Sequence, residues 1–314
     1  MGRLKLSLRW MAVVSLIVNI VIIVTGGLVR LTDSGLGCST WPQCTPGSYT
    51  PHAALGIHGA IEFGNRMITF ILIIVAVLTF VAALTNRTGD RHHDRSVTWI
   101  SFAIGLGIPF QGVIGGITVL SHLNPYVVAL HMLDSLVLVV LAVWLVRLTW
   151  PAPPRPVGRR ARALTVIAFG LTWVVVSLGT IVTGSGPHAG SAGARRTGLD
   201  PAEISHLHSF SVYLLIVATI GCLVLIRNRA ALLLLLVEVA QGVIGFVQYY
   251  TGLPMGVVIL HMLGAAATMA LATNLLCSVR LTAGSEPVSH RPASAGHPTL
   301  ERPVPSGSQP MPRS

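Results

Sequence analysis

The sequence predicts an all-α, polytopic membrane protein whose eight transmembrane helices form two pseudo-symmetric four-helix bundles. Three observations lead to this prediction. Only 10% of the 314 residues are charged and 52% are hydrophobic, whereas about a quarter of the residues in a typical soluble domain are charged. The apolar residues lie in runs long enough to cross a bilayer. One block of sequence also occurs twice, 130 residues apart.

Eight apolar runs are expected to form the helices, because each approaches the ~20 residues that span a hydrocarbon core. In chain order they cover residues 10–29, 55–84, 97–120, 126–146, 164–184, 204–226, 230–250 and 256–279. The first run leads into further membrane helices, so we expect a transmembrane helix there and not a signal peptide. The tail at 281–314 is rich in Pro, Ser and Gly and is expected to be disordered.

The net charge of +11 could suggest binding to nucleic acid, but its distribution favours a different explanation. The arginines and lysines gather before the first helix and in every second connection after it, whereas the other connections hold few. Basic connections remain on the cytoplasmic side of a membrane. The sequence therefore predicts a multi-pass protein of the cell membrane with both termini in the cytoplasm, and no nucleic-acid partner.

The repeated block indicates a duplicated unit. "QGVIGGITVLSHLNPYVVALHML" at 111–133 and "QGVIGFVQYYTGLPMGVVILHML" at 241–263 are identical at 12 of 23 positions, and each has a His twenty residues after its Gln. The simplest arrangement is a pair of four-helix halves, at 10–146 and 164–280, related by an axis along the membrane normal. Each half would then be a bundle with a site in its own core.

Close helix packing explains the glycines of the repeat, such as Gly115 and Gly245, because small residues let helices approach one another. It does not explain His131 and His261. A polar side chain inside a membrane helix is costly and therefore indicates a function. The alternative for any single buried His is a hydrogen bond to a neighbouring group.

A third histidine, His208, strengthens the functional interpretation of the C-terminal half. His208 and His261 each lie nineteen residues from the first arginine at the inner end of their helix, Arg227 and Arg280. The two residues should therefore share one depth in the outer half of the membrane. Two facing neutral imidazoles can bind a heme iron from both sides. We expect His208 and His261 to be the two ligands of the iron of a resident heme.

The helix at 55–84 carries a polar stripe made of His58, Glu62 and Asn65, with Arg66 beside it. One interpretation is that Glu62 and Arg66 form an ion pair that allows both to be buried. The other is that Glu62 is an acidic group beside a reactive centre. Asp134 adds a further polar group to this half. The polar N-terminal half is therefore the candidate for chemistry, and the symmetric C-terminal half the candidate for a permanent cofactor.

Two cysteines lie in the first outer connection, "RLTDSGLGCSTWPQCTPG". Cys38 and Cys44 are predicted to be exposed to the oxidising side of the membrane, where disulfides persist. We favour a disulfide over free thiols or a zinc site, since zinc needs further ligands nearby. Cys222 and Cys277 are expected to be core residues.

Taken together, "GLVRLTDSGLGCSTWPQC", the stretch from Glu62 to Arg66 and the two "QGVIG…LHML" blocks resemble the heme A synthase family over residues 10–280. The resemblance implies an oxidoreductase that converts a methyl group of heme O to the formyl group of heme A for cytochrome oxidase. It implies that heme b is held by His208 and His261, and that heme O, the substrate, lies near Glu62 and His131. It also implies contact with heme O synthase and with the assembly of cytochrome oxidase.

The chain departs from the family at one position, because the family commonly has a His three residues after the Glu and this chain has Asn65. Either His58 replaces the missing ligand of the substrate heme, or His131 is its only strong ligand.

Two other functions are compatible with such a chain. A membrane cytochrome b acting only in electron transfer would need the heme ligands but has little use for Glu62 or the disulfide. A transporter built on repeats is expected to have helix-breaking residues at matching positions. Pro109, however, corresponds to Val239, which argues against a transporter.

Overall fold

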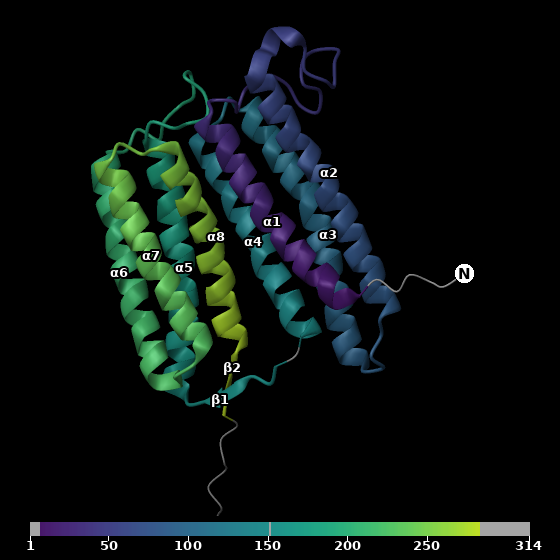
Figure 1. Ribbon diagram of the computed structural model, residues 1–314, viewed down its shortest axis with the longest axis vertical. Coiled ribbons are helices and arrows are strands. Elements are labelled where there is room, and N and C mark those ends of the chain that lie inside the picture. Colours follow the sequence, from purple (N-terminus) through teal and green to yellow (C-terminus); the bar gives the residue numbers. More distant parts are fainter. Residues whose placement is uncertain (1–6, 151, 283–314) are drawn as a thin grey trace, which may run out of the picture. The chain divides into compact units, whose positions relative to one another are not determined.

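The structure is a computed structural model that describes residues 7–150 and 152–282. Within these residues, eight α-helices are long and apolar enough to cross a membrane, as Figure 1 shows. This confirms the predicted all-α, multi-pass membrane fold. The helices are α1 (Leu8–Leu31), α2 (Gly56–Thr85), α3 (Arg91–Leu120), α4 (Pro125–Thr149), α5 (Arg159–Ser185), α6 (Pro201–Ile226), α7 (Arg229–Tyr250) and α8 (Met255–Cys277). A single 3-10 turn, η1 (Ala53–Leu55), precedes α2.

Two helices begin well before their apolar runs, by more than the difference of one to three residues seen at the starts of the other helices. Helix α3 starts at Arg91 instead of 97, because the side chain of Asp90 accepts hydrogen bonds from the backbone N–H groups of His92 and His93 and so caps the helix. Helix α5 starts at Arg159 instead of 164. Polar residues extend a helix beyond the membrane without loss of hydrogen bonds, so hydrophobicity alone underestimates its length.

The helices pack in two groups of four (Figure 1). In the first group α1 contacts α2 and α4, and α3 also contacts both; in the second, α5 contacts α6 and α8, and α7 also contacts both. The groups meet where α8 packs against α1 and α4, and where α4 packs against α5. The two halves predicted from the repeat, at 10–146 and 164–280, fall within these two groups.

Arg30, at the C-terminal end of α1, joins the two groups. Its Nε donates a hydrogen bond to the carbonyl oxygen of His188 at 2.5 Å, and its Nη2 donates to that of Thr183 at 2.7 Å. The Gly35 N–H also donates to the Gly190 carbonyl at 2.9 Å. The connection after α1 is thereby attached to the connection after α5.

A short parallel pair of strands lies at the opposite end and was not expected. Strand β1 (Arg155–Val157) pairs with β2 (Val279–Leu281), with Arg155 opposite Val279. The pair ties the α4–α5 connection to the chain that follows α8. Of the tail expected at 281–314, the part from residue 283 lies outside the described residues.

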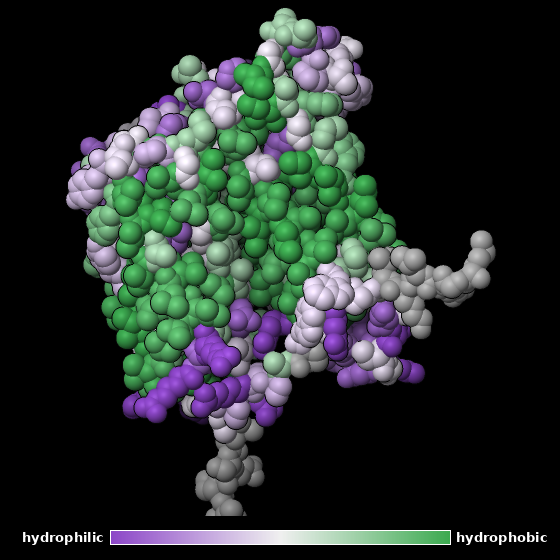
Figure 2. All heavy atoms as spheres, viewed as in Figure 1, coloured by the Kyte–Doolittle hydropathy of each residue, from purple (hydrophilic) through white to green (hydrophobic). Residues whose placement is uncertain are grey.

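The surface of the helices is apolar over a wide band. Figure 2 shows hydrophobic residues along the middle of the molecule and hydrophilic residues at its two ends. Large apolar side chains such as Val217 and Val224 are 67% and 65% exposed. Soluble proteins rarely expose apolar patches of this extent. The band is therefore the lipid-facing surface of a membrane protein.

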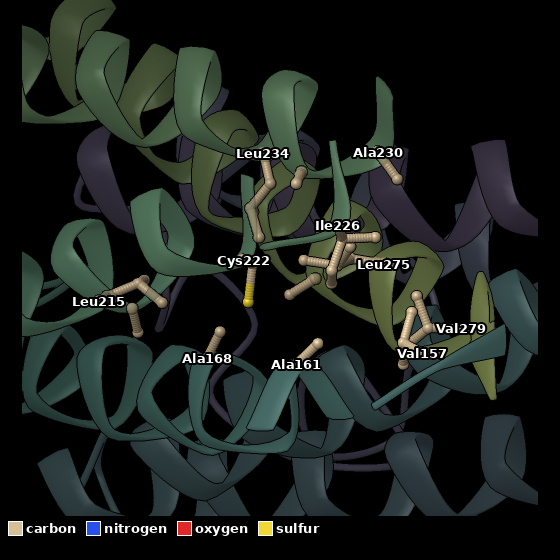
Figure 3. Packing of buried hydrophobic residues seen from close by; sticks show 13 residues of the cluster. Val157, Ala161, Ala168, Leu215, Cys222, Ile226, Ala230, Leu234, Leu275 and Val279 are labelled. Atoms are coloured by element: carbon tan, nitrogen blue, oxygen red, sulfur yellow. The ribbon is translucent and has the colours of Figure 1, made fainter. Parts of the chain in front are cut away.

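Small and apolar residues fill the end of the second group that lies next to β1 and β2, as Figure 3 shows. Ala161 and Ala168 of α5 lie against a cluster that includes Leu215 and Cys222 of α6 and Leu275 of α8. The prediction that Cys222 is a core residue is confirmed, because its side chain is fully buried, while Cys277 is partly buried.

Candidate functional site

The two copies of the repeat build the same local arrangement, in which a histidine ring lies over a helix glycine. A methyl group added to Gly115 of α3 would lie 3.3 Å from Cε1 of His131 on α4. A methyl group added to Gly245 of α7 would lie 3.7 Å from Cε1 of His261 on α8. The glycines therefore do more than bring helices together, since they leave room for an imidazole between them.

His208 on α6 has a similar seat on α5. A methyl group on Gly179 would lie 3.3 Å from its Cε1, and its Nδ1 is 3.0 Å from the carbonyl oxygen of Val175. A carbonyl only accepts hydrogen bonds, so Nδ1 must be the donor and the lone pair of a neutral ring lies on Nε2. A histidine that ligates a metal is commonly oriented in this way. His208 and His261 lie near enough to interact electrostatically.

His131 and His261 differ from His208 because their Nδ1 atoms are buried without a hydrogen-bond partner in the described structure. Leaving a buried polar atom unpaired costs about 1–3 kcal/mol. A bound group that engages the ring would remove this cost. The residues therefore fit heme, because a heme iron can bind the nitrogen of an imidazole ring.

Glu62 of α2 is 5% exposed, and both of its oxygens are occupied. Oε1 is 2.5 Å from Nη2 of Arg66, and Oε2 accepts a hydrogen bond from the Cys38 N–H at 2.7 Å. The ion pair that one interpretation of the sequence expected is thus present. Arg66 also donates to the carbonyl oxygens of Thr40 and Gln43, at 3.0 and 3.2 Å. Together the two side chains hold the connection after α1 against α2.

That connection is closed by the expected disulfide between Cys38 and Cys44. Its Trp41 packs directly on Gly116 of α3, where any side chain would collide with the indole ring. Gly116 is the neighbour of Gly115, which seats His131. The disulfide loop, defined as residues 38–44, therefore folds back over the N-terminal group close to His131.

The remaining residues of the predicted stripe have different surroundings. His58 is exposed in the first turn of α2, and its Nδ1 is 3.0 Å from the Ser34 hydroxyl. Asn65 is partly buried, and its Oδ1 is buried without a hydrogen-bond partner in the described structure. Asn65 thus has an unused polar atom inside the bundle, whereas His58 contacts the connection after α1.

One pair of equivalent positions differs between the groups. Gly264 of α8 corresponds to Asp134 of α4. In the C-terminal group the amide of Gln241 occupies the space above Gly264, where a side chain would collide with it. In the N-terminal group Gln111 instead donates to the His131 carbonyl and the Ser135 hydroxyl, at 3.3 and 3.1 Å. Asp134 has an unpartnered Oδ2, so this group is the more polar of the two.

The sequence analysis did not single out Glu238, which is 2% exposed in α7. The available signal was an acidic residue within the apolar run "LLLLLVEVA". It also missed the contacts of Arg30, which no local pattern predicts.

The fold and these side chains define a class of protein: a polytopic membrane protein with histidines seated on glycines inside its helix groups. The chain belongs to the COX15-CtaA family of cytochrome oxidase assembly proteins, whose model matches residues 9–193. The matched part includes Glu62 and His131 and ends before His208 and His261.

Curated relatives carry the name heme A synthase. The protein of Lysinibacillus sphaericus is 28% identical over 186 residues, which is 56% of this chain and 57% of the relative. That of Staphylococcus haemolyticus is 29% identical over 185 residues, 57% and 59% of the two chains. That of Staphylococcus epidermidis is 33% identical over 134 residues, 42% of each. The matched region thus spans roughly half of the length of these relatives.

Proposed function

We propose that the protein is a heme A synthase, which oxidises a methyl group of heme O to a formyl group. The observation that carries the proposal is the repeated seat of an imidazole on a glycine, Gly115 with His131 and Gly245 with His261, in a chain of this family. Two related groups of helices can hold two hemes, and the N-terminal group, with Glu62, Arg66 and Asp134, has the more polar surroundings.

The N-terminal group is the proposed place of the reaction. His131 would ligate the iron of heme O, and Glu62 with Arg66 would lie beside the ring. Both oxygens of Glu62 accept hydrogen bonds, which supports a fixed negative charge more than a mobile proton acceptor. Such a charge stabilises positive charge that develops near the reacting carbon. The disulfide loop would exclude water from this side, since Trp41 packs against α3.

The C-terminal group is the proposed place of heme b. His208 lies on α6 and His261 on α8, and each of these helices packs against both α5 and α7. His208 has the tautomer of a ligand that binds through Nε2. Heme b, when bound, would supply a centre that accepts and releases one electron at a time. The Val175 carbonyl would orient the ring of His208, and Gly245 would leave room for the ring of His261.

Substrate and product imply partners. An enzyme that makes heme O must supply the substrate, and the assembling cytochrome oxidase would consume heme A. We therefore propose heme O synthase and oxidase assembly factors as neighbours in the same membrane.

The orientation in the membrane is also part of the proposal. The arginine-rich connections, including residues 147–163, would lie in the cytoplasm with both termini. Residues 31–53, which include the disulfide loop, and residues 184–203 would lie outside. A reporter fused after Arg160 should behave as cytoplasmic, and an extracytoplasmic signal would overturn this topology.

Extraction and mass analysis of the bound hemes is the decisive experiment. Heme b together with heme O or heme A in the purified protein supports the synthase. Heme b alone would favour a membrane cytochrome b that acts only in electron transfer. Protein without any heme would contradict both functions.

A further inference from the structure

Glu238 is an acidic residue in the middle of α7 with no cationic partner among the described residues. Its side chain is 2% exposed. Oε1 accepts a hydrogen bond from the Thr219 hydroxyl of α6 at 2.9 Å, and Oε2 has no hydrogen-bond partner. The equivalent position of the repeat in α3 is Ile108. The carboxyl group is therefore a feature of the C-terminal group alone.

The surroundings favour the protonated form of this carboxyl group. An unpaired carboxylate in a low-dielectric interior is far more costly than a neutral acid with one hydrogen bond. On α6, the titratable group that interacts electrostatically with Glu238 is Cys222, whose thiol carries no positive charge in either protonation state. Helix α8 runs antiparallel to α7, because Gly245 contacts His261 and Gln241 contacts Gly264. At the level of Glu238, α8 therefore has the uncharged residues around Thr268. No residue on either packed helix supplies a positive charge that would hold Glu238 in its ionised form, so only the positive charge of an oxidised cofactor nearby can do so.

Glu238 lies on the face of α7 that leads to the histidines. Gln241 and Gly245 follow it by three and seven residues and share its face of the helix. Gly245 seats His261, so the carboxyl group lies about 10 Å along the helix axis from the level of that ring. At such a distance, in an interior with few mobile charges, a change of one unit charge at the cofactor strongly changes the energy of the ionised carboxyl group.

We propose that Glu238 is a proton-binding site coupled to the charge of the cofactor held by His208 and His261. In the oxidised state the positive charge of the cofactor holds Glu238 as a carboxylate. When the cofactor gains one electron from the oxidation of heme O, Glu238 binds one proton at its free oxygen, and when the electron leaves, the proton is released. The net charge of the buried region then stays constant. This inference rests on the proposed function, because it requires heme b in the C-terminal group.

The first test is infrared difference spectroscopy on the full-length protein, purified with its native heme, between the oxidised and reduced states. The expected result is a band of a protonated carboxyl group that appears on reduction and shifts in heavy water. Glu238→Gln should abolish the band, and Thr219→Val should move it by removing the hydrogen bond. Glu203→Gln is the matched control, because Glu203 is exposed in the first turn of α6. The absence of such a band in the wild-type protein would overturn the proposal.

The second test is the pH dependence of the heme b midpoint potential. In the wild type and in Glu203→Gln the potential should fall as pH rises, and the slope should be flatter in Glu238→Gln. An unchanged heme b absorption spectrum in Glu238→Gln shows that this variant is folded. Equal slopes in all three proteins would refute the role of Glu238 and leave the proposed synthase intact. Preparations without heme b would refute both.

Discussion

The backbone N–H of Cys38 donates a hydrogen bond to Oε2 of Glu62 at 2.7 Å, so that one carboxylate joins the disulfide loop to the helix beneath it. The other oxygen pairs with Arg66. Glu62 is therefore both a structural anchor of the loop and the acidic group proposed to act in the reaction. A variant at this position must be tested for both roles.

Glu62→Gln is expected to keep the fold and the heme b of the C-terminal group but to stall the conversion of heme O. The amide preserves the shape of the side chain but removes the charge, and the loss of a positioned catalytic group commonly lowers a rate by about 100-fold or more. The measurement is the ratio of heme O to heme A in membranes of expressing cells. His131→Ala should also abolish conversion, because it removes the proposed ligand.

Glu203→Gln serves as the control for these variants, since Glu203 is exposed and distant in sequence from the loop. An Arg66→Gln variant separates the two roles of Glu62, because it frees the loop carbonyl groups but leaves the carboxylate. Normal production of heme A by Glu62→Gln would remove Glu62 from the chemistry.

His208→Ala and His261→Ala are each expected to abolish the low-spin b-type absorption spectrum, because each removes one of the two ligands proposed for heme b. The glycine seats give a finer test. A methyl group on Gly179 would lie 3.3 Å from His208, closer than ordinary contact, whereas one on Gly245 would lie 3.7 Å from His261. Gly179→Ala should therefore perturb the spectrum, and Gly245→Ala should leave it nearly unchanged. Wild-type spectra from both histidine variants would rule out this ligand pair.

Cys38 and Cys44 are expected to resist alkylation until a reductant is added. The disulfide closes a short loop with a sequence separation of 6. It lowers the conformational entropy of the unfolded chain and so stabilises the folded loop by about 2 kcal/mol. Mass spectrometry after alkylation with and without reductant measures the modification. Cys222 is buried in the core and provides an internal control for accessibility. Ready labelling of both loop cysteines without reductant is incompatible with the linkage.

His58→Ala is expected to lower the production of heme A, and Asn65→His is expected to be tolerated. The unpartnered Oδ1 of Asn65 indicates a position where an imidazole could take part in binding. His58 contacts the hydroxyl of Ser34, so Ser34→Ala tests whether its effect comes only from holding the loop.

If Ser34→Ala and His58→Ala lower the heme A to heme O ratio equally, His58 acts through the loop. A larger effect of His58→Ala supports the replacement of the missing ligand. Full activity of His58→Ala would exclude that replacement while leaving the role of His131 untouched.

The sequence by itself determined the number of helices and showed that His131 and His261 occupy equivalent positions in the two copies of the repeat. A membrane helix forms all of its backbone hydrogen bonds within one segment, so a local run of apolar residues is sufficient to predict it. The repeat similarly predicted equivalent places for the two histidines. The spacing of Cys38 and Cys44, with their expected side of the membrane, was sufficient for the disulfide.

Only the tertiary structure decided which groups the buried polar atoms meet. The partner of Glu62 on the loop, the contacts of Arg30 with the connection after α5, and the bond from Thr219 to Glu238 all join residues distant in sequence or on different elements. Apolar periodicity reports which face of a helix avoids water, but not what lies opposite that face. The partners of a buried polar atom depend on how the helices pack, because hydrogen bonds require contact within about 3 Å.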